Sequence, residues 1–366
     1  MAKMFLYPIS WIFGTVTYFR NKLFDYKILK SKEFDLPVIS IGNITVGGTG
    51  KTPHTEYLID LLKEEFKVAT LSRGYKRKTK GFVLAGNHSK STSIGDEPLQ
   101  IKTKFPDIQV AVDEKRVRGI QNLLKFKKDI KPDVILLDDA FQHRYVKPGL
   151  NILLIDYNRP ISEDKLLPAG SLRESSQGIN RANIVIMTKC PEKIQPIQRR
   201  IISKEINLRP YQNLFFTTLE YGKLQPAFQG NAKQIDAFYT EQAYSVLLVT
   251  GIANPKPIRD YITPFAKRIE EISYPDHHHF TQKDMTNIAQ KLDTMDGSRK
   301  IIITTEKDVM RIRDMEVDGA ISSSLFYLPI RIKFLDSEGK QFDKKILNYV
   351  RENKSNFELH TRTNKL

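Results

Sequence analysis

The chain has 366 residues, about two to three times the length of a typical domain, which excludes a single small binding module and predicts two domains. Hydrophobic residues make up 40% and charged residues 27%, and one cysteine, Cys190, is present; this composition excludes wholesale disorder and a disulfide-stapled secreted fold, and favours a reducing cytosolic setting. A net charge of +16 favours an anionic partner such as a nucleotide, a nucleic acid or an acidic lipid.

The first predicted element is an uncharged, aromatic-rich segment from Met4 to Phe19. Basic residues follow it, namely Arg20, Lys22, Lys27, Lys30 and Lys32. The segment includes Pro8 and Gly14 and falls short of the roughly 20 apolar residues that a spanning helix needs. It therefore predicts a monotopic helix whose apolar side chains enter the headgroup boundary of a membrane. An amphipathic helix packed on the protein's own core is the alternative, and the two can coexist.

Short apolar runs then alternate with helical stretches along the chain. The runs rich in β-branched residues are 37–41, 67–71, 108–112, 134–137, 152–155, 184–187, 246–249 and 301–303. Runs of this length are typical of buried parallel strands. The alternation predicts an α/β fold, with a parallel sheet flanked by helices.

The strongest local motif is GNITVGGTGKTP, from Gly42 to Pro53, directly after the first strand. Its glycines allow the backbone N–H groups to face phosphate oxygens, and the following helix adds its positive end. The sequence predicts a P-loop NTPase-like domain that binds ATP through Thr45, Val46, Gly47, Gly48, Thr49, Gly50, Lys51 and Thr52, with the Thr52 hydroxyl on Mg²⁺. Thr45 stands where the G-x-x-x-x-G-K-S/T pattern has its first glycine. A merely structural glycine-rich turn is the alternative.

Acidic residues provide the candidates for metal binding and proton transfer. Asp138 and Asp139 end a strand, as a Mg²⁺-binding carboxylate does in such folds, although acidic turns also occur there. The turn SIGDEP places Asp96 and Glu97 side by side, one able to act as a base and the other to bind metal; an exposed acidic turn is equally consistent with it. His277, in the run DHHH, could share the proton-transfer role. Zinc is disfavoured, because consecutive histidines cannot easily converge on one ion.

Polar residues near these motifs are candidates for substrate binding. Arg144 and Arg173 could stabilise phosphate charge, and His143, beside Gln142, could orient an acceptor. Arg73 opens a basic loop that suits a phosphorylated substrate. Any of these residues could equally form loop ion pairs or a solvated face.

Taken in order, the motifs GNITVGGTGKTP, LSRGYKRK, GDEP, DDAFQHR, PAGSLRE, PDHHHF and TTEKD resemble those of the tetraacyldisaccharide 4′-kinases, a family of the lipid A pathway. The resemblance runs from Met4 to Arg311. It implies a peripheral enzyme on the cytoplasmic face of the inner membrane that moves the γ-phosphate of ATP to the 4′-hydroxyl of a tetraacylated glucosamine disaccharide 1-phosphate, giving lipid IVA. Ser171, Ala140 and the tail after Asp336 depart from the family pattern.

The resemblance also implies residue roles. Asp96 and His277 form the dyad that activates the hydroxyl, and Lys51 and Thr52 keep their P-loop roles. Glu97, Asp138 and Asp139 are the carboxylates on the Mg²⁺ side.

The predicted segments are a membrane-associated helix (1–30), a P-loop kinase domain (31–208), linker strands (209–241), a second, smaller α/β domain (242–345) and a C-terminal tail (346–366).

Two other functions compete with the lipid kinase. The first is a membrane-recruited P-loop ATPase switch, which would hydrolyse ATP slowly without a glycolipid. The second is nucleic-acid binding through the positive charge, which ranks last because no recognition motif accompanies the charge. We therefore expect no nucleic-acid partner, and no obligate protein partner is evident.

Overall fold

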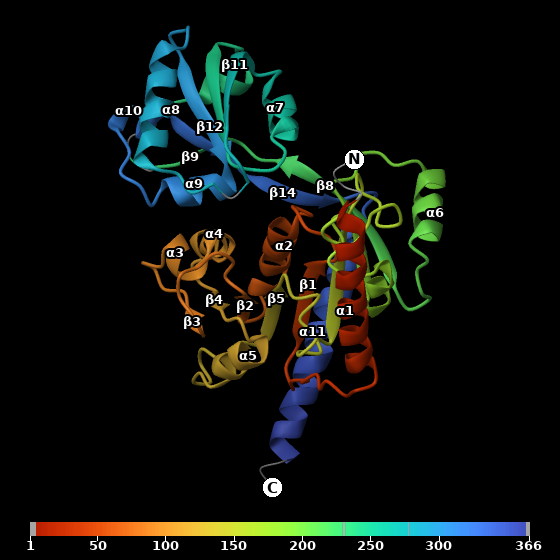
Figure 1. Ribbon diagram of the computed structural model, residues 1–366. Coiled ribbons are helices and arrows are strands. Elements are labelled where there is room, and N and C mark those ends of the chain that lie inside the picture. Colours follow the sequence, from red (N-terminus) through yellow and green to blue (C-terminus); the bar gives the residue numbers. More distant parts are fainter. Residues whose placement is uncertain (1–4, 229, 231, 277, 364–366) are drawn as a thin grey trace. The chain divides into compact units, whose positions relative to one another are not determined.

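The computed structural model describes residues 5–228, 230, 232–276 and 278–363, with side chains as far as 354. The described chain forms two compact units, shown in Figure 1. Unit 1 is formed by the described parts of Met1–Ser89, Ile101–Leu219 and Ile332–Leu366. Unit 2 is formed by the described parts of Lys90–Gln100 and Glu220–Arg331.

A mostly parallel sheet forms the centre of unit 1. Its strands lie in the order β14 (Ile330–Phe334), β8 (Asn213–Tyr221), β7 (Ile184–Thr188), β6 (Leu150–Asp156), β1 (Val38–Asn43), β5 (Val134–Asp138), β2 (Val68–Ser72), β4 (Gln109–Val112) and β3 (Val83–Leu84). All six residues of β1 are buried, between β5 on one side and β6 on the other. Because β1 and β5 run parallel with Ile41 opposite Asp138, both strands end at the same edge of the sheet.

Unit 1 also contains several helices. They are α1 (Tyr7–Asp25), α2 (Lys51–Lys63), α4 (Asp96–Lys104), α5 (Arg116–Leu124), α6 (Pro196–Glu205) and α11 (Gly339–Thr363), with a 3₁₀ turn at Ser176–Arg181. Pro8 and Pro196 occupy the first turns of α1 and α6, where a missing N–H costs nothing. The boundary between the units falls within α4.

Unit 2 is a smaller α/β unit. Its sheet has the order β11 (Ala266–Ser273), β10 (Tyr244–Thr250), β12 (Lys300–Thr305), β13 (Leu325–Leu328) and β9 (Gln225–Pro226), with α3 (Ser91–Ile94), α7 (Lys256–Ile262), α8 (Gln282–Thr294), α9 (Glu306–Ile312), α10 (Gly319–Ser324) and a 3₁₀ turn at Asp236–Tyr239. Thr281 caps α8 and Thr305 caps α9 with side-chain oxygens. Buried residues of β10 and β12 form the core on both faces of the sheet.

Helix α1 combines a buried edge with an exposed aromatic face. Only Ser10 and Phe24 of the helix are buried, and Ser10 Oγ accepts a hydrogen bond from Ala169 N at 2.9 Å within unit 1. Large apolar side chains such as Trp11, Ile12, Val16 and Phe19 are exposed. Within the described residues, none of the helices has both the length and the apolar character needed to cross a bilayer.

Two segments have long-range pairings that the sequence prediction did not include. Strands were expected in the range 209–241, and one of them, β8, lies parallel to β7 in the unit 1 sheet, with Ile186 opposite Phe215. The range 346–366 was expected to form a tail, but α11 runs through its first part and buries Ile346 and Val350. Both differences arise from pairing with residues distant in the chain, which local sequence does not encode.

Candidate active site

The glycine-rich loop joins β1 to α2 at the edge of the unit 1 sheet where β1 and β5 end. Gly47 and Gly50 have φ angles of 96° and 84°, in the left-handed region where a side chain is strained. Gly50 directly precedes α2, so the loop leads its backbone to the amino-terminal end of a helix that begins at Lys51. The unpaired N–H groups and the dipole of that end favour a bound anion. The loop conformation therefore suits the predicted phosphate-binding role.

Neighbouring segments of unit 1 hold this loop in place. Val46 N donates to Ser171 O at 2.8 Å, and Arg159 Nη1 donates to Val46 O at 3.2 Å. The carbonyl of Thr49 accepts from Thr188 Oγ1 at 2.9 Å, and its hydroxyl accepts from Asn43 Nδ2 at 2.9 Å. The ends of β6 and β7 thus fix the backbone of the loop before any ligand binds.

Two adjacent aspartates lie beside the loop at the end of β5. Asp138 is buried and accepts a hydrogen bond from Thr55 Oγ1 of α2 at 3.3 Å. Asp139 has a φ of 47° and contacts two cations, with Lys51 Nζ at 3.6 Å and Arg173 Nη1 at 2.9 Å. Burial by itself raises the pKa of Asp139, but Lys51 and Arg173 together hold it below its ordinary value. The carboxylate is therefore ionised at neutral pH.

Three residues with oxygen donors suited to Mg²⁺ lie at the start of α2 and the end of β5. They are the hydroxyl of Thr52 and the carboxylates of Asp138 and Asp139. In the described part of the chain, no group of three or more Asp, Glu, His or Cys side chains is placed to hold a metal ion. Mg²⁺ in kinases is usually held by one or two carboxylates together with substrate phosphates. The donor chemistry fits an ion of that kind, shared with a nucleotide.

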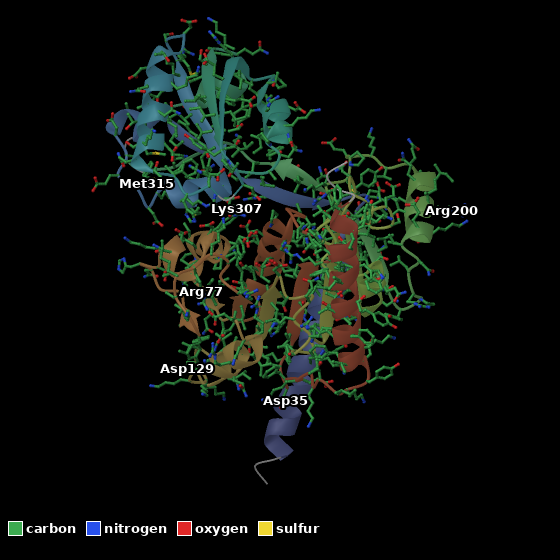
Figure 2. All side chains as sticks on the ribbon, viewed as in Figure 1. Asp35, Arg77, Asp129, Arg200, Lys307 and Met315 are labelled. Atoms are coloured by element: carbon green, nitrogen blue, oxygen red, sulfur yellow. The ribbon has the colours of Figure 1, made fainter. Side chains whose placement is uncertain are left out.

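Glu97, the other predicted metal ligand, belongs to unit 2. Its carboxylate forms an ion pair with Lys307 Nζ of α9 at 3.2 Å. Lys307 is labelled in Figure 2.

Two of the predicted substrate residues, Gln142 and Arg144, contact α1. Arg144 donates to Asn21 O at 2.8 Å and to Asp25 Oδ1 at 2.7 Å. Gln142 Nε2 donates to Asn43 O at 2.6 Å and to Glu174 Oε1 at 3.0 Å. Asn21 Nδ2 also donates to Glu174, at 3.1 Å. The polar edge of α1 is thereby tied to the loop that follows β5.

Arg116 is a residue of this region that the sequence did not single out. It opens α5, is 3% exposed, and its Nε has no hydrogen-bond partner among the described residues. Burial lowers the pKa of its guanidinium to about 10, an effect that Asp139 and Asp138 oppose. Burial and the charges of Arg116, Arg20 and Arg73 lower the pKa of His143 to about 4, so its imidazole is neutral. No motif marks Arg116, because its environment is formed by residues distant in sequence.

Asp96, the predicted base for the acceptor hydroxyl, belongs to unit 2. Asp96 opens α4 and forms an ion pair with Arg311 Nη2 of α9 at 2.6 Å. His277 lies outside the described residues. His278 stacks on Tyr274, with ring centroids 4.4 Å apart, and its Nε2 lies 3.0 Å from Asp284 Oδ2. Arg311, in the motif TTEKDVMR, was not predicted as a site residue.

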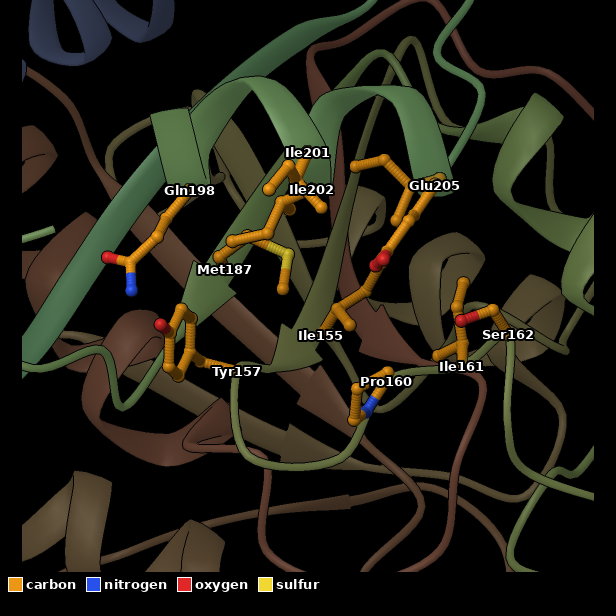
Figure 3. Close-up of a pocket in the computed structure, with 11 residues that line it drawn as sticks. Ile155, Tyr157, Pro160, Ile161, Ser162, Met187, Gln198, Ile201, Ile202 and Glu205 are labelled. Atoms are coloured by element: carbon orange, nitrogen blue, oxygen red, sulfur yellow. The ribbon is translucent and has the colours of Figure 1, made fainter. Parts of the chain in front are cut away.

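An apolar cavity of about 270 Å³ lies between α6 and the ends of β6 and β7 in unit 1. Figure 3 shows the side chains of Ile155, Met187, Ile201 and Ile202 converging on it. Its described lining includes none of the predicted site residues. The cavity is therefore distinct from the cluster around Lys51 and Asp139.

Comparison with known proteins identifies the family. A profile described as tetraacyldisaccharide-1-P 4′-kinase matches residues 2–351. The tetraacyldisaccharide 4′-kinase of Bacteroides thetaiotaomicron is 50% identical over 366 residues, covering 98% of this chain and 96% of the relative. The chain belongs to the tetraacyldisaccharide-1-P 4′-kinase family. Another member, the tetraacyldisaccharide 4′-kinase of Phocaeicola vulgatus, is 52% identical over 353 residues, covering 96% of each chain.

A solved structure shares the fold of this family member. The crystal structure of LpxK from Aquifex aeolicus in complex with ATP aligns with a TM-score of 0.73 and 29% sequence identity, over 96% of this chain and 99% of that chain. The predicted resemblance and the α/β fold with a mostly parallel sheet are thus confirmed. Membership of the tetraacyldisaccharide 4′-kinase family does not favour the ATPase switch. The roles of the individual site residues stay predictions.

Proposed function

We propose that the chain transfers the γ-phosphate of ATP to the 4′-hydroxyl of a tetraacylated glucosamine disaccharide 1-phosphate, giving lipid IVA in lipid A biosynthesis. The family match over residues 2–351 carries this proposal. The glycine-rich loop supports it, because its left-handed glycines lead into the amino-terminal end of α2, where Lys51 is fixed beside Asp139.

Phosphoryl transfer depends mainly on positioning and on stabilising charge. The backbone N–H groups of Thr45 to Thr52 and the ammonium of Lys51 bind the phosphates. Thr52, Asp138 and Asp139 of unit 1 would be oxygen donors for Mg²⁺, which would neutralise phosphate charge when bound. Glu97 of unit 2 stays a further predicted donor. Arg173, which lies outside the P-loop, adds positive charge beside Asp139.

On the acceptor side, a carboxylate must take the proton of the attacking hydroxyl. We assign this role to Asp96, with His277 as its partner. Arg73, Gln142, His143, Arg144 and Arg173 bind the phosphorylated sugar. The neutral imidazole of His143 suits a hydrogen bond to a hydroxyl rather than an ion pair with phosphate.

The acylated acceptor is a bilayer component, so the proposal places the chain peripherally on the cytoplasmic face of the inner membrane. The exposed aromatic side chains of α1 and the lysines that follow it support this location. Basic residues near an anionic surface contribute about 1 kcal/mol each to binding.

Transfer of labelled γ-phosphate from ATP to tetraacyldisaccharide 1-phosphate in mixed micelles tests the proposal. Labelled lipid is expected from the native chain and not from Lys51→Ala. Lys63→Ala is the matched control, because Lys63 lies on the same helix and pairs only with surface-exposed Asp60 among its described ion-pair partners. ATP hydrolysis that requires Lys51 but yields no labelled lipid would favour the ATPase switch.

A further inference from the structure

The guanidinium of Arg311 binds three segments of unit 2. Its Nε and Nη2 donate to Oδ2 of Asp96 at 2.9 and 2.6 Å. Its Nη1 donates to Oδ1 of Asp308 at 3.1 Å and to the carbonyl of His278 at 3.4 Å. The Arg311 side chain is 3% exposed and that of Asp308 is fully buried, so these contacts form where little water competes.

The carboxylate of Asp308 holds the guanidinium of Arg311 at Nη1. Its Oδ2 accepts hydrogen bonds from Gly251 N at 2.9 Å and from Thr305 Oγ1 at 2.7 Å, while its Oδ1 binds Arg311. Asp308 and Arg311 stand three residues apart on α9, on one face of the helix. The capped start of α9 thus holds Arg311 in a single orientation.

The same helix binds the start of α4 at a second point. Lys307, four residues before Arg311, pairs with Glu97 next to Asp96. Two parallel ion pairs therefore join α9 to the turn GDEP. Residues 90–100 are part of unit 2, although about 200 residues of chain separate the partners in these ion pairs.

We propose that Arg311 is a positioning residue, which holds the Asp96 carboxylate at a fixed place relative to the backbone carbonyl of His278. The inference rests on the proposed function of Asp96. One planar guanidinium binds both Asp96 and the carbonyl of His278, the residue after His277, so it fixes the spacing of the two segments. Misplacement of a reacting group by about 1 Å can lower a rate about 10²-fold.

Steady-state lipid phosphorylation by Arg311→Gln and Arg311→Lys tests this role. We expect Arg311→Gln to lower kcat about 10²-fold while the KM for ATP stays within about 2-fold, because the nucleotide loop is untouched. Arg311→Lys keeps the charge but cannot make all of these hydrogen bonds, so its kcat should lie between those of Arg311→Gln and the native chain. Arg313→Gln is the matched control, since Arg313 donates to Ala227 O and has no described contact with Asp96. Its kcat should stay within about 2-fold of native.

A double-mutant cycle separates positioning from a general loss of structure. If Arg311 acts through Asp96, the double variant Asp96→Asn/Arg311→Gln should have the kcat of Asp96→Asn alone. Losses that multiply, or an unchanged kcat in Arg311→Gln, would overturn the inference. If Arg311→Gln does not fold, as thermal denaturation would reveal, the same cycle is run with Arg311→Lys. A native chain that forms no labelled lipid would contradict the proposed function itself, a result distinct from multiplying losses in an active enzyme.

Discussion

The ammonium of Lys51 lies 3.6 Å from Oδ1 of Asp139, so the first residue of α2 is paired with the residue that follows β5. Arg173 donates to both oxygens of the same carboxylate, at 2.9 and 3.1 Å. Together the two cations offset the cost of burying the Asp139 charge. Before nucleotide binds, the carboxylate therefore orients the cation that is proposed to bind phosphate.

Replacement of Asp139 by asparagine removes this charge and keeps the shape of the side chain. We expect Asp139→Asn to lower kcat about 10²-fold and to require a higher Mg²⁺ concentration for half-maximal rate, because one hard oxygen donor loses its charge. Titration of the lipid kinase rate with Mg²⁺ measures both effects. Asp60→Asn, an exposed carboxylate on α2, is the control. An unchanged Mg²⁺ requirement in Asp139→Asn would remove this residue from the proposed metal site.

Cys190 provides a chemical probe of the unit 1 core. Its thiol lies in a buried hydrophobic cluster just after β7, and burial raises its pKa to about 12. Because the thiolate is the reactive form, we expect a thiol reagent at pH 8 to label the native chain at least about 10²-fold more slowly than the chain in denaturant. The absorbance of the chromophore that the reagent releases measures the labelling rate of the native and of the denatured chain. Equal rates would contradict the packing around Cys190.

Local patterns predicted the elements that surround the site. The apolar runs at 37–41 and 134–137 correspond to β1 and β5, and the end of β5 carries Asp138 as expected. The glycine-rich loop leads into α2 at Lys51. These predictions agree with the structure because strand length, glycine spacing and the start of a helix depend on consecutive residues.

Several contacts between distant residues were not predicted, such as that of Asp96 with Arg311. Asp96 was expected to lie in the domain of the P-loop, yet it belongs to unit 2, where it pairs with Arg311. Buried Glu174 likewise binds side chains from three other parts of the chain, namely Asn21, Gln142 and Arg181. No spacing rule in one sequence encodes a partner 215 positions away, so tertiary packing decides these contacts.

Exposed apolar side chains of α1 predict how strongly the chain binds a membrane. Trp11 is 74% exposed and Phe19 is 61% exposed. Burial of such side chains contributes about 1.5–3 kcal/mol each, so Trp11→Ser together with Phe19→Ser should weaken binding to anionic vesicles by at least about 10²-fold. Co-sedimentation measures the bound fraction. Ile197→Ser, at an equally exposed apolar position of α6, should bind as the native chain does. Equal binding by all three proteins would contradict the proposed anchor.

His54 should make the stability of unit 1 depend on pH. Its Nδ1 lies 2.7 Å from Gly50 O and its Nε2 lies 3.1 Å from Thr217 Oγ1, so the imidazole links α2 to β8 beneath the loop. Burial lowers its pKa from 6.5 to about 4, an effect that the hydrogen bond to Gly50 only partly opposes. The unfolded chain therefore binds a proton between these values that the folded chain does not. The stability that neutral His54 supplies is complete above pH 6.5 and is lost as the pH falls toward 4.

Between pH 7 and pH 5 this linkage should lower the free energy of unfolding by about 2 kcal/mol. Denaturant titrations at the two pH values measure the difference, and the same pair of titrations on His54→Gln should show a decrease smaller by about that amount. His88, whose environment is an exposed turn, provides the control His88→Gln, which should keep the native pH dependence. His143 has a pKa lowered to about 4 as well, so a decrease persists in His54→Gln, and His54→Gln/His143→Gln should reduce it further. If His54→Gln loses as much stability as the native chain between the two pH values, the imidazole is not held neutral beneath the loop.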